Sequence, residues 1–327
     1  MGHSKKRLRR STRKRILIVS VFFFLIAFVL LLKYSSSLFQ IDVKDIHSGK
    51  TITHDDITYY PRQDITTLLI LAVDRTENPL KPVGNNTTAE ASALLIFDDS
   101  TEKLNIISFH RDTIATIAEL DDTGKQTNTV STQLALAHSY GDGWSASAEN
   151  TVNALSELMF GAPVDYYISV DVDALPVLND AVDGVKVTIR DDFTSVDPDL
   201  QMGDMVLMGE QSITYLQLRR DGKIPTNTSL AGRQRDYING FLKSLEKSIN
   251  NNDFQVAKLR NKIKSDVVSN CSNKTLFSMI ERFATYSLEE IFIPEGKDIP
   301  NGGVMEHHVD HEQLKLLVLD LMYSPKK

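Results

Sequence analysis

Residues 67–75 read TLLILAVDR, an apolar run that ends abruptly at Asp74 and Arg75. A run without polar alternation is typical of a strand that is buried on both faces. We expect a second strand at 93–97, a turn at 98–100, and at 104–108 a strand that is either its hairpin partner or a neighbour in the sheet. Because a sheet holds the groups at its strand ends rigidly, we expect a functional site there.

The remainder of the chain alternates strand and helix patterns. Strands are expected at 166–170 and 185–189, and helices at 131–139, 147–159, 173–181, 234–248, 275–286 and 310–322. Buried strands that alternate with helices predict an α/β fold, in which helices flank a central mixed β-sheet. One transmembrane helix is expected to precede this domain.

The N-terminus carries a topology signal. Residues 16–32 contain one polar side chain, that of Ser20, and at about 1.5 Å per residue they can cross a hydrocarbon core of about 30 Å. Residues 1–15 contain eight basic residues and no acid, so they are expected to stay in the cytoplasm while the rest is exported. A cleaved signal peptide is the alternative, but no small-x-small site follows. We therefore expect a cytoplasmic tail at 1–15 and a single membrane span at 16–33.

Charge and cysteine content limit the partners and the compartment. The chain has a net charge of −7 and residues 1–15 carry +8, so residues 16–327 carry −15. An acidic exported domain argues against nucleic acid as a partner, and the basic tail is interpreted as contacting the lipid bilayer. The single cysteine, Cys271, excludes an internal disulfide. A domain of this size can bury a sufficient core without one, which fits a Gram-positive cell surface.

Charged groups gather at three places that follow apolar segments. They are Asp74-Arg75, the segment 108–113 (SFHRDT), and the segment 217–221 (QLRRD), which a loop joins to 233–236 (RQRD). Guanidinium groups match the oxygens of a diphosphate, and carboxylates such as Asp74 and Glu90 suit Mg²⁺. Arg–Asp pairs are also common as structural salt bridges, so these patterns alone leave both interpretations open.

Taken in order, several segments resemble the LytR-CpsA-Psr family over residues 66–245. They are 69–74 (LILAVD), 106–113 (IISFHRDT), 135–141 (ALAHSYG), 163–167 (PVDYY), 179–187 (NDAVDGVKV), 209–212 (GEQS), 218–219 (LR) and 233–234 (RQ). The resemblance implies an α/β/α catalytic-type domain at 66–248. A stalk at 34–65 would precede it, and a helical and strand extension at 249–327 would pack on it.

The resemblance also implies an activity. Family members are ligases that move an anionic glycan from a polyprenyl-pyrophosphate carrier to a peptidoglycan hydroxyl, a phosphoryl transfer that depends on Mg²⁺ or Mn²⁺. The metal would be held by Asp74 and Glu90, and Asp74 or Asp112 would accept the proton of the hydroxyl. The phosphates would be bound by Arg111, Arg219, Arg220, Arg233 and Gln234. The polyprenyl tail would need an apolar tunnel, for which the candidates are Leu134, Val152, Leu155, Phe241 and Leu242, although ordinary core packing is the better explanation for each of them taken singly.

The sequence departs from the family pattern at four places. Thr88-Ala89-Glu90 stands where Arg-Ser-Asp is usual, His110 replaces a proline, and Gln217 and Leu230 replace arginines. The loss of three positive charges keeps a second class of function open, a polyprenyl-phosphate or glycan-binding scaffold or regulator. A DNA-binding role has no support, because residues 1–15 are too short to fold. The histidines at 307, 308 and 311 are interpreted as a solvated turn before the last helix rather than as a zinc site.

Overall fold

The structure is a computed structural model that describes most of the chain beyond residue 48. The described residues are 49–75, 84–85, 87–121, 123–216, 233, 236–237, 239–241, 243–244, 247–248, 262–263, 265–272, 275 and 286–325. No helix within these ranges is long and apolar enough to cross a bilayer. The expected tail and membrane span, residues 1–33, lie outside them. The chain divides into two compact units, with described residues 49–170 and 268–325 in the sheet unit and those of 171–267 in the hairpin unit.

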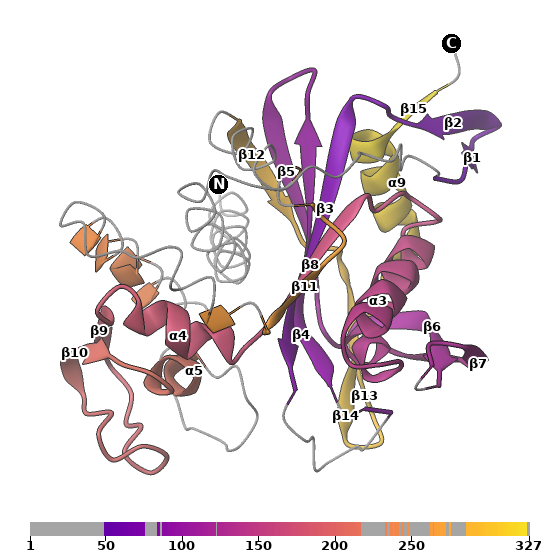
Figure 1. Ribbon diagram of the computed structural model, residues 1–327. Coiled ribbons are helices and arrows are strands. Elements are labelled where there is room, and N and C mark those ends of the chain that lie inside the picture. The colour runs from indigo at the N-terminus through magenta and orange to yellow at the C-terminus, as the bar shows by residue number, and fades with distance from the viewer. Residues whose placement is uncertain are drawn as a thin grey trace, which may run out of the picture. The chain divides into compact units, whose positions relative to one another are not determined.

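A six-stranded mixed sheet forms the centre of the sheet unit, in the order β11-β8-β3-β4-β5-β12 (Figure 1). The strands β3 (Ile65–Asp74), β4 (Thr88–Asp98) and β5 (Lys103–Phe109) are antiparallel neighbours, and β12 (Ser287–Phe292) runs parallel to β5. The sheet continues through β8 (Tyr166–Asp171) to β11 (Val267–Ser269). Most of β3 is buried, as its apolar run predicts. The parallel and antiparallel pairs among the six strands confirm the predicted central mixed sheet.

Two helices cover this sheet, and Figure 1 shows α3 (Ser145–Leu158) and α9 (His311–Met322) on the same side of it. Their apolar residues join those of the central strands in one core, in which Leu69, Leu155 and Val318 are fully buried. Leu134 and Leu155 are part of this core and Val152 packs against it. Of the other two tunnel candidates, Phe241 is buried in the hairpin unit and Leu242 lies outside the described residues.

The helix expected at 131–139 is wrong over its first three residues. Residues 131–133 end the strand β7 (Gln126–Gln133), which pairs with β6 (Ile114–Leu120), and only Leu134–Ser139 forms a short 3-10 helix, η1. The cause is the alternation of threonine with polar residues before 133, because β-branched side chains fit a pleated strand better than a helix.

Part of the expected stalk is folded. β1 (Ile52–His54) and β2 (Ile57–Pro61) form a small sheet with β15 (Tyr323–Pro325) near the end of the chain. The backbone pairing of β2 with β15 ties residues 57–61 to the end of α9. These strands are short and half-exposed, so their sequence lacks the apolar run that reveals a buried strand.

The hairpin unit consists of α4 (Ala174–Asp180), the antiparallel strands β9 (Val185–Ile189) and β10 (Gly203–Leu207), and α5 (Gln211–Leu216). The described residues between 233 and 248 are helical. The strand predicted at 185–189 is therefore confirmed, and the helix predicted at 173–181 corresponds to α4. The division into units falls at 171 and 267, so the segment 66–248, expected as one domain, contributes to both.

Candidate functional site

The register of three strands brings candidate residues to one edge of the sheet. Asp74 ends β3 and lies opposite Thr88 at the start of β4. Ser92 of β4 lies opposite Phe109, the last residue of β5. Continuing this register places Glu90 opposite Arg111, and the two side chains form an ion pair between Oε2 and Nη1. The structure therefore brings together Asp74, Glu90 and Arg111, as the sequence predicted for the strand ends.

A β-bulge sets the position of Glu90. Ala72 pairs with Ala91 and Val73 pairs with Ala89, so Glu90 has no partner on β3. Bulges of this kind redirect a side chain at the rim of a sheet and are frequent beside active sites. The hydroxyl of Thr88 donates to Glu90 Oε1 at 2.9 Å. Thr88 thus lies between the carboxylate of Glu90 and the strand-end position of Asp74.

Arg111 is held by carboxylates on both sides. Its Nε lies 3.5 Å from Asp112 Oδ1, and the side chains of Glu90, Arg111 and Asp112 are 14%, 12% and 11% exposed. The amide of Gln133 donates to Asp112 Oδ1 at 2.9 Å and to the Met305 carbonyl at 2.7 Å. Because these charges are largely withdrawn from water, their interactions are stronger than those of surface pairs. The guanidinium of Arg111 is therefore positioned by two carboxylates, while its buried Nε makes no hydrogen bond to the described residues.

Arg75 supplies a second cation at this edge. Its Nη1 donates to the carbonyl of Gly143, and its guanidinium carbon lies 3.7 Å from the centre of the Trp144 ring. A cation over an indole face is stabilised by the ring quadrupole. In the sequence, Arg75 stands out only as the neighbour of Asp74, and no role for it can be predicted from that position. Its place directly after a buried strand was the signal available for it.

A buried histidine supports the start of β4. His138 is fully buried, with Nδ1 2.8 Å from the Thr87 hydroxyl and Nε2 3.4 Å from the Ser169 hydroxyl. The carboxamide of Asn85 accepts from the Thr87 backbone N–H at 2.9 Å and donates to the Ser147 hydroxyl at 3.1 Å. This network joins the segment before β4 to η1 and to the start of α3. His138 belongs to the motif at 135–141, but the sequence alone predicts no role for it, because its hydrogen-bond partners come from distant segments.

Burial lowers the pKa of His138 to about 3, and the positive charge of Arg75 contributes. Since the unfolded chain has a histidine pKa of about 6.5, the unfolded state binds more protons between pH 3 and 6.5. His138 should therefore remove about 3 kcal/mol from the free energy of unfolding between pH 7 and pH 4, at about 1.4 kcal/mol per pH unit. Urea unfolding of the protein and of His138→Gln at several pH values tests this. The variant should show a shallower loss below pH 6.5, and equal slopes would contradict it.

Two further histidines lie near Asp112. The rings of His110 and His307 have centres 5.5 Å apart, and His110 Nδ1 lies 3.7 Å from Asp112 Oδ2. Burial lowers the pKa of His110, with the charge of Asp112 acting in the opposite direction. His307 and His308 belong to β14 (Val304–Val309), which pairs with β13 (Gly296–Asn301), so the expected solvated turn is wrong for them. The turn lies instead at Gly302 and Gly303, whose positive φ angles suit a tight hairpin.

Arg233 lies in the hairpin unit and is 1% exposed. Its Nε donates to the Tyr215 carbonyl at 3.0 Å, Nη1 lies 3.5 Å from Asp191 Oδ2, and the guanidinium carbon is 5.6 Å from the Phe193 ring centre. Burial lowers the pKa of Arg233, although Asp191 opposes this. The remaining candidates, Arg219, Arg220 and Gln234, lie outside the described residues.

The predicted metal ligands were Asp74 and Glu90. Both carboxylates lie at the same sheet edge, and the described parts of the chain contain no group of three or more His, Cys, Asp or Glu that could hold a metal ion. Mg²⁺ needs only one or two protein carboxylates when substrate phosphates and water complete its coordination. The described residues therefore offer a cation two carboxylates at this edge, of which Glu90 is already paired with Arg111.

Comparisons with known proteins identify the family of the chain and solved structures that share its fold. The model of the LytR_cpsA_psr family matches residues 29–318. The polyisoprenyl-teichoic acid–peptidoglycan teichoic acid transferase TagU of Enterococcus faecalis is 23% identical, over 76% of this chain and 75% of its own length. Biofilm regulatory protein A of Streptococcus mutans is 26% identical over 71% of this chain, which spans 57% of that relative. The crystal structure of protein gbs0355 from Streptococcus agalactiae shares the fold with a TM-score of 0.55 and 20% identity, covering 79% of this chain and 86% of that one. With the family model matching most of its length, the chain belongs to the LytR_cpsA_psr family.

Proposed function

We propose that the protein transfers an anionic glycopolymer from a polyprenyl-diphosphate carrier to a hydroxyl of peptidoglycan. Two findings support this reaction class: the family of the chain, and its similarity to TagU, which is named as a teichoic acid transferase that acts on peptidoglycan. The observation that carries the proposal is the position of Arg111, fixed between Glu90 and Asp112 at the edge of the sheet. A preorganised guanidinium at a rigid strand end suits the charge that develops on a transferring phosphoryl group.

The proposed reaction breaks one bond and forms one. The oxygen of the acceptor hydroxyl attacks the phosphorus that carries the glycan, and the bond from that phosphorus to the bridging oxygen breaks. The products are a glycan–peptidoglycan phosphodiester and polyprenyl monophosphate. Asp112 or Asp74 accepts the proton of the hydroxyl. The hydrogen bond from Gln133 orients the Asp112 carboxylate, which leaves Oδ2 on the side of His110.

The charge balance of the edge favours a bound cation. The described side chains there comprise three carboxylates and two guanidinium groups, those of Asp74, Glu90, Asp112, Arg75 and Arg111. A diphosphate would meet an excess of negative charge, which must be offset if it is to bind. We propose that Mg²⁺ or Mn²⁺, held by Asp74 and Glu90 together with the phosphates, neutralises that charge when bound.

Asp74→Asn tests the metal role. The substitution keeps the size of the side chain but removes its charge, so transfer should need a much higher Mg²⁺ concentration and fall about tenfold or more at a fixed low one. The measurement is the rate of transfer against Mg²⁺ concentration, with Asp121→Asn as a matched control, because Asp121 lies in an exposed turn of the sheet unit. An unchanged titration in Asp74→Asn would exclude Asp74 as a ligand.

Membrane anchoring belongs to the same proposal. Residues 16–33 would hold the domain on the outer face of a Gram-positive membrane, where the lipid-linked donor also resides. Confinement raises the effective concentration of the two partners without any new contact. The peptidoglycan acceptor would approach from the wall side.

A second function remains testable, that of a binding scaffold or regulator without catalysis. The burial of Arg233 against Asp191 favours it, because that guanidinium is already engaged within the protein. The purified full chain would be mixed with a synthetic polyprenyl-diphosphoryl glycan, peptidoglycan oligomers and Mg²⁺, and the products analysed by mass spectrometry. A glycan–peptidoglycan phosphodiester supports the transferase, whereas donor binding with no product from several glycans supports the scaffold.

A further inference from the structure

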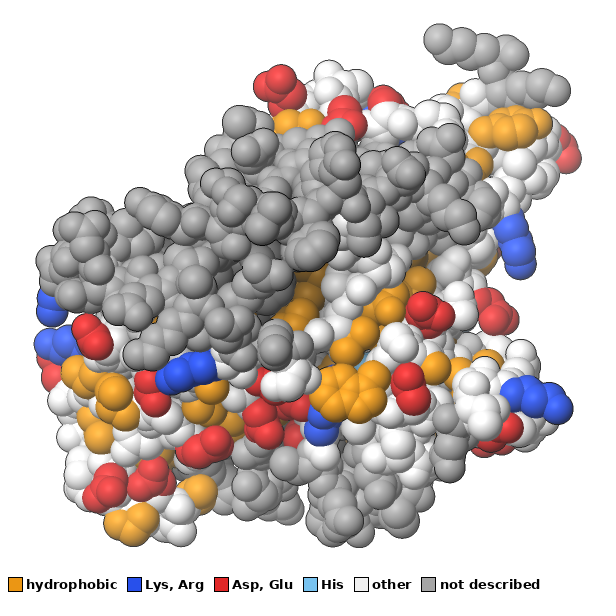
Figure 2. All heavy atoms as spheres, in the orientation of Figure 1, with side chains coloured by type: hydrophobic (Ala, Val, Ile, Leu, Met, Phe, Trp, Pro, Cys, Tyr) orange, Lys and Arg blue, Asp and Glu red, His pale blue; other side chains and the backbone are white. Residues whose placement is uncertain are grey.

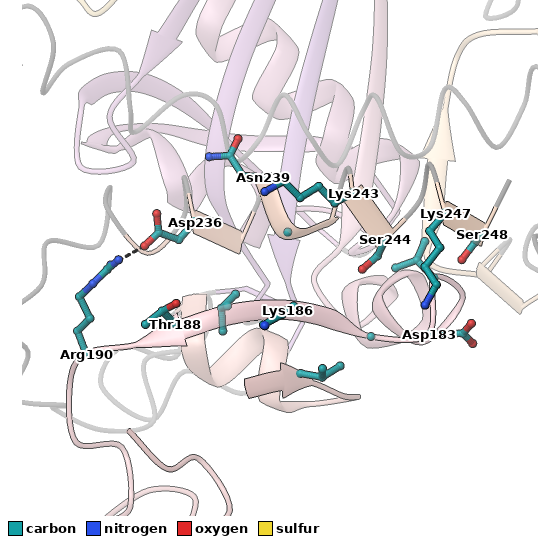
Figure 3. A pocket seen from close by; sticks show the side chains of 15 residues that line it. Asp183, Lys186, Thr188, Arg190, Asp236, Asn239, Lys243, Ser244, Lys247 and Ser248 are labelled. Carbon is teal, nitrogen blue, oxygen red and sulfur yellow. Dashed lines mark hydrogen bonds and ion pairs between the residues drawn. The ribbon is translucent and has the colours of Figure 1, made fainter. Parts of the chain in front are cut away.

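A groove lies in the hairpin unit, in a region to which the proposed reaction assigns no role. It has a volume of about 690 Å³ and runs between β9 and the helical residues from 236 to 248. Figure 3 shows the ion pair of Arg190 and Asp236 at one end, Lys247 and Asp183 at the other, and Lys186 and Lys243 between them. All of these residues belong to the hairpin unit, so the groove is formed within it.

Two glycines shape the groove by letting its walls approach. A Cβ added to Gly240 would lie 2.2 Å from the carbonyl oxygen of Lys186, so the helical segment packs directly on β9. Gly184 has a φ of +80°, and a Cβ there would meet Val206 at 2.6 Å. The short apolar side chains of Val182, Val187 and Val206 line the groove together with charged and hydroxyl side chains.

The rims of the groove are basic in a chain that is otherwise acidic. Four cations line the groove against two carboxylates, those of Asp183 and Asp236. Arg190 pairs with Asp236 at 2.6 Å, and Lys186 pairs with Asp204 at 3.1 Å. Lys243 and Lys247 are exposed, and no ion pair within the described part of the chain involves them. By contrast, residues 16–327 carry a net charge of −15, and acidic side chains are spread over the face shown in Figure 2.

We propose that this groove, lined by Lys186, Lys243 and Lys247, binds the phosphodiester backbone of an anionic glycopolymer. The proposal rests on the proposed function for the class of ligand, and it assigns that ligand a second contact, made by side chains of the hairpin unit. The lysines would pair with successive phosphates, while Thr188, Asn239 and Ser244 offer hydrogen bonds to sugar or polyol hydroxyls.

The spacing of the lysines favours a polymer over a single phosphate. Lys243 and Lys247 are one helical turn apart, about 6 Å along the axis, so their flexible stems present two separate point charges. An isolated exposed pair contributes little, whereas several pairs along one chain add through high effective concentration. The mixture of charged, hydroxyl and short apolar side chains in the lining suits an extended chain of alternating phosphates and carbon units.

The test measures binding of a lipid-free poly(glycerol phosphate) to the purified full chain, using a fluorescent end label at low salt. The charge reversals Lys243→Glu and Lys247→Glu, made together, should weaken binding on the order of tenfold, and salt should weaken binding to the unaltered protein. The matched control is Lys125→Glu with Lys297→Glu, which makes the same charge change at exposed lysines of the sheet unit. Circular dichroism would establish that both variants are folded.

The outcomes separate the groove from the proposed function. A lysine-dependent affinity that the control variant keeps supports the groove, and it stands even if the chain catalyses no transfer. Equal affinity in both variants, or no binding of the polymer by the unaltered protein, overturns it. Vesicles of anionic lipid form a second arm, and lysine-dependent binding to vesicles without binding to the polymer also overturns it, in favour of a membrane contact.

Discussion

Arg111→Ala is expected to lower the rate of glycopolymer transfer by about 10³-fold or more, the range known for an arginine that stabilises a transferring phosphoryl group. The reason is that Arg111 presents its guanidinium at the end of β5, where Glu90 and Asp112 hold it in place. Alanine removes the charge and leaves two carboxylates that repel a diphosphate. The measurement is the initial rate with saturating Mg²⁺.

Two controls make this result interpretable. Arg111→Lys keeps the charge but loses the planar fork, so it should retain part of the activity. Because alanine at 111 also leaves Glu90 without its ion pair to Arg111, urea unfolding monitored by circular dichroism establishes whether Arg111→Ala is folded under the assay conditions. A folded Arg111→Ala protein that transfers glycan at the normal rate would exclude Arg111 from the site.

Arg233→Ala is expected to destabilise the protein by about 3–5 kcal/mol, the usual cost of breaking a buried ion pair from one side. The side chains of Arg233 and Asp191 are 2% and 1% exposed, so alanine would leave the Asp191 carboxylate buried without this partner. It would also remove the hydrogen bond to the Tyr215 carbonyl. Urea unfolding monitored by circular dichroism measures the change.

A double-mutant cycle separates the ion pair from the packing of the long side chain. Asp191→Asn in the Arg233→Ala background removes the buried charge that has lost its ion pair with Arg233, and it should recover part of the lost stability. Arg190→Ala is the matched control, because Arg190 forms an exposed pair with Asp236 and should cost about 1 kcal/mol or less. A cost for Arg233→Ala that is no larger than the control would contradict a structural role for the pair.

The central strands could be predicted from the sequence because burial on both faces leaves an unbroken apolar run. Apolar runs at 67–73, 93–97 and 104–108 predict β3, β4 and β5, whereas the antiparallel pairing of β3 with β4 is known only from the structure. The strand-end position of Asp74 and the family motif at Arg111 also follow from local sequence. The short, half-exposed strands β1 and β2 carry no such run, so the sequence predicts a stalk at 34–65 that includes them.

Other parts of the candidate site depend on contacts between distant segments. The bulge at Glu90 is a property of the register between β3 and β4, and no local pattern reveals it. The neutral state of His138 in η1 follows from its burial beside Thr87, which precedes β4, and Ser169 of β8. Likewise, Arg233 carries a family motif in the sequence, but only the packing of Asp191 and Phe193 shows that it is buried.

The most direct test of the central claim follows each phosphorus atom of the donor through the reaction. A donor labelled at the phosphorus next to the glycan, and separately at the phosphorus next to the polyprenyl chain, would be incubated with peptidoglycan, Mg²⁺ and the purified full chain. The account predicts that the first label enters peptidoglycan as a phosphodiester and that the second remains on polyprenyl monophosphate, in equal amounts. Retention of both labels on an intact, bound donor, or transfer of glycan without phosphorus, would contradict it.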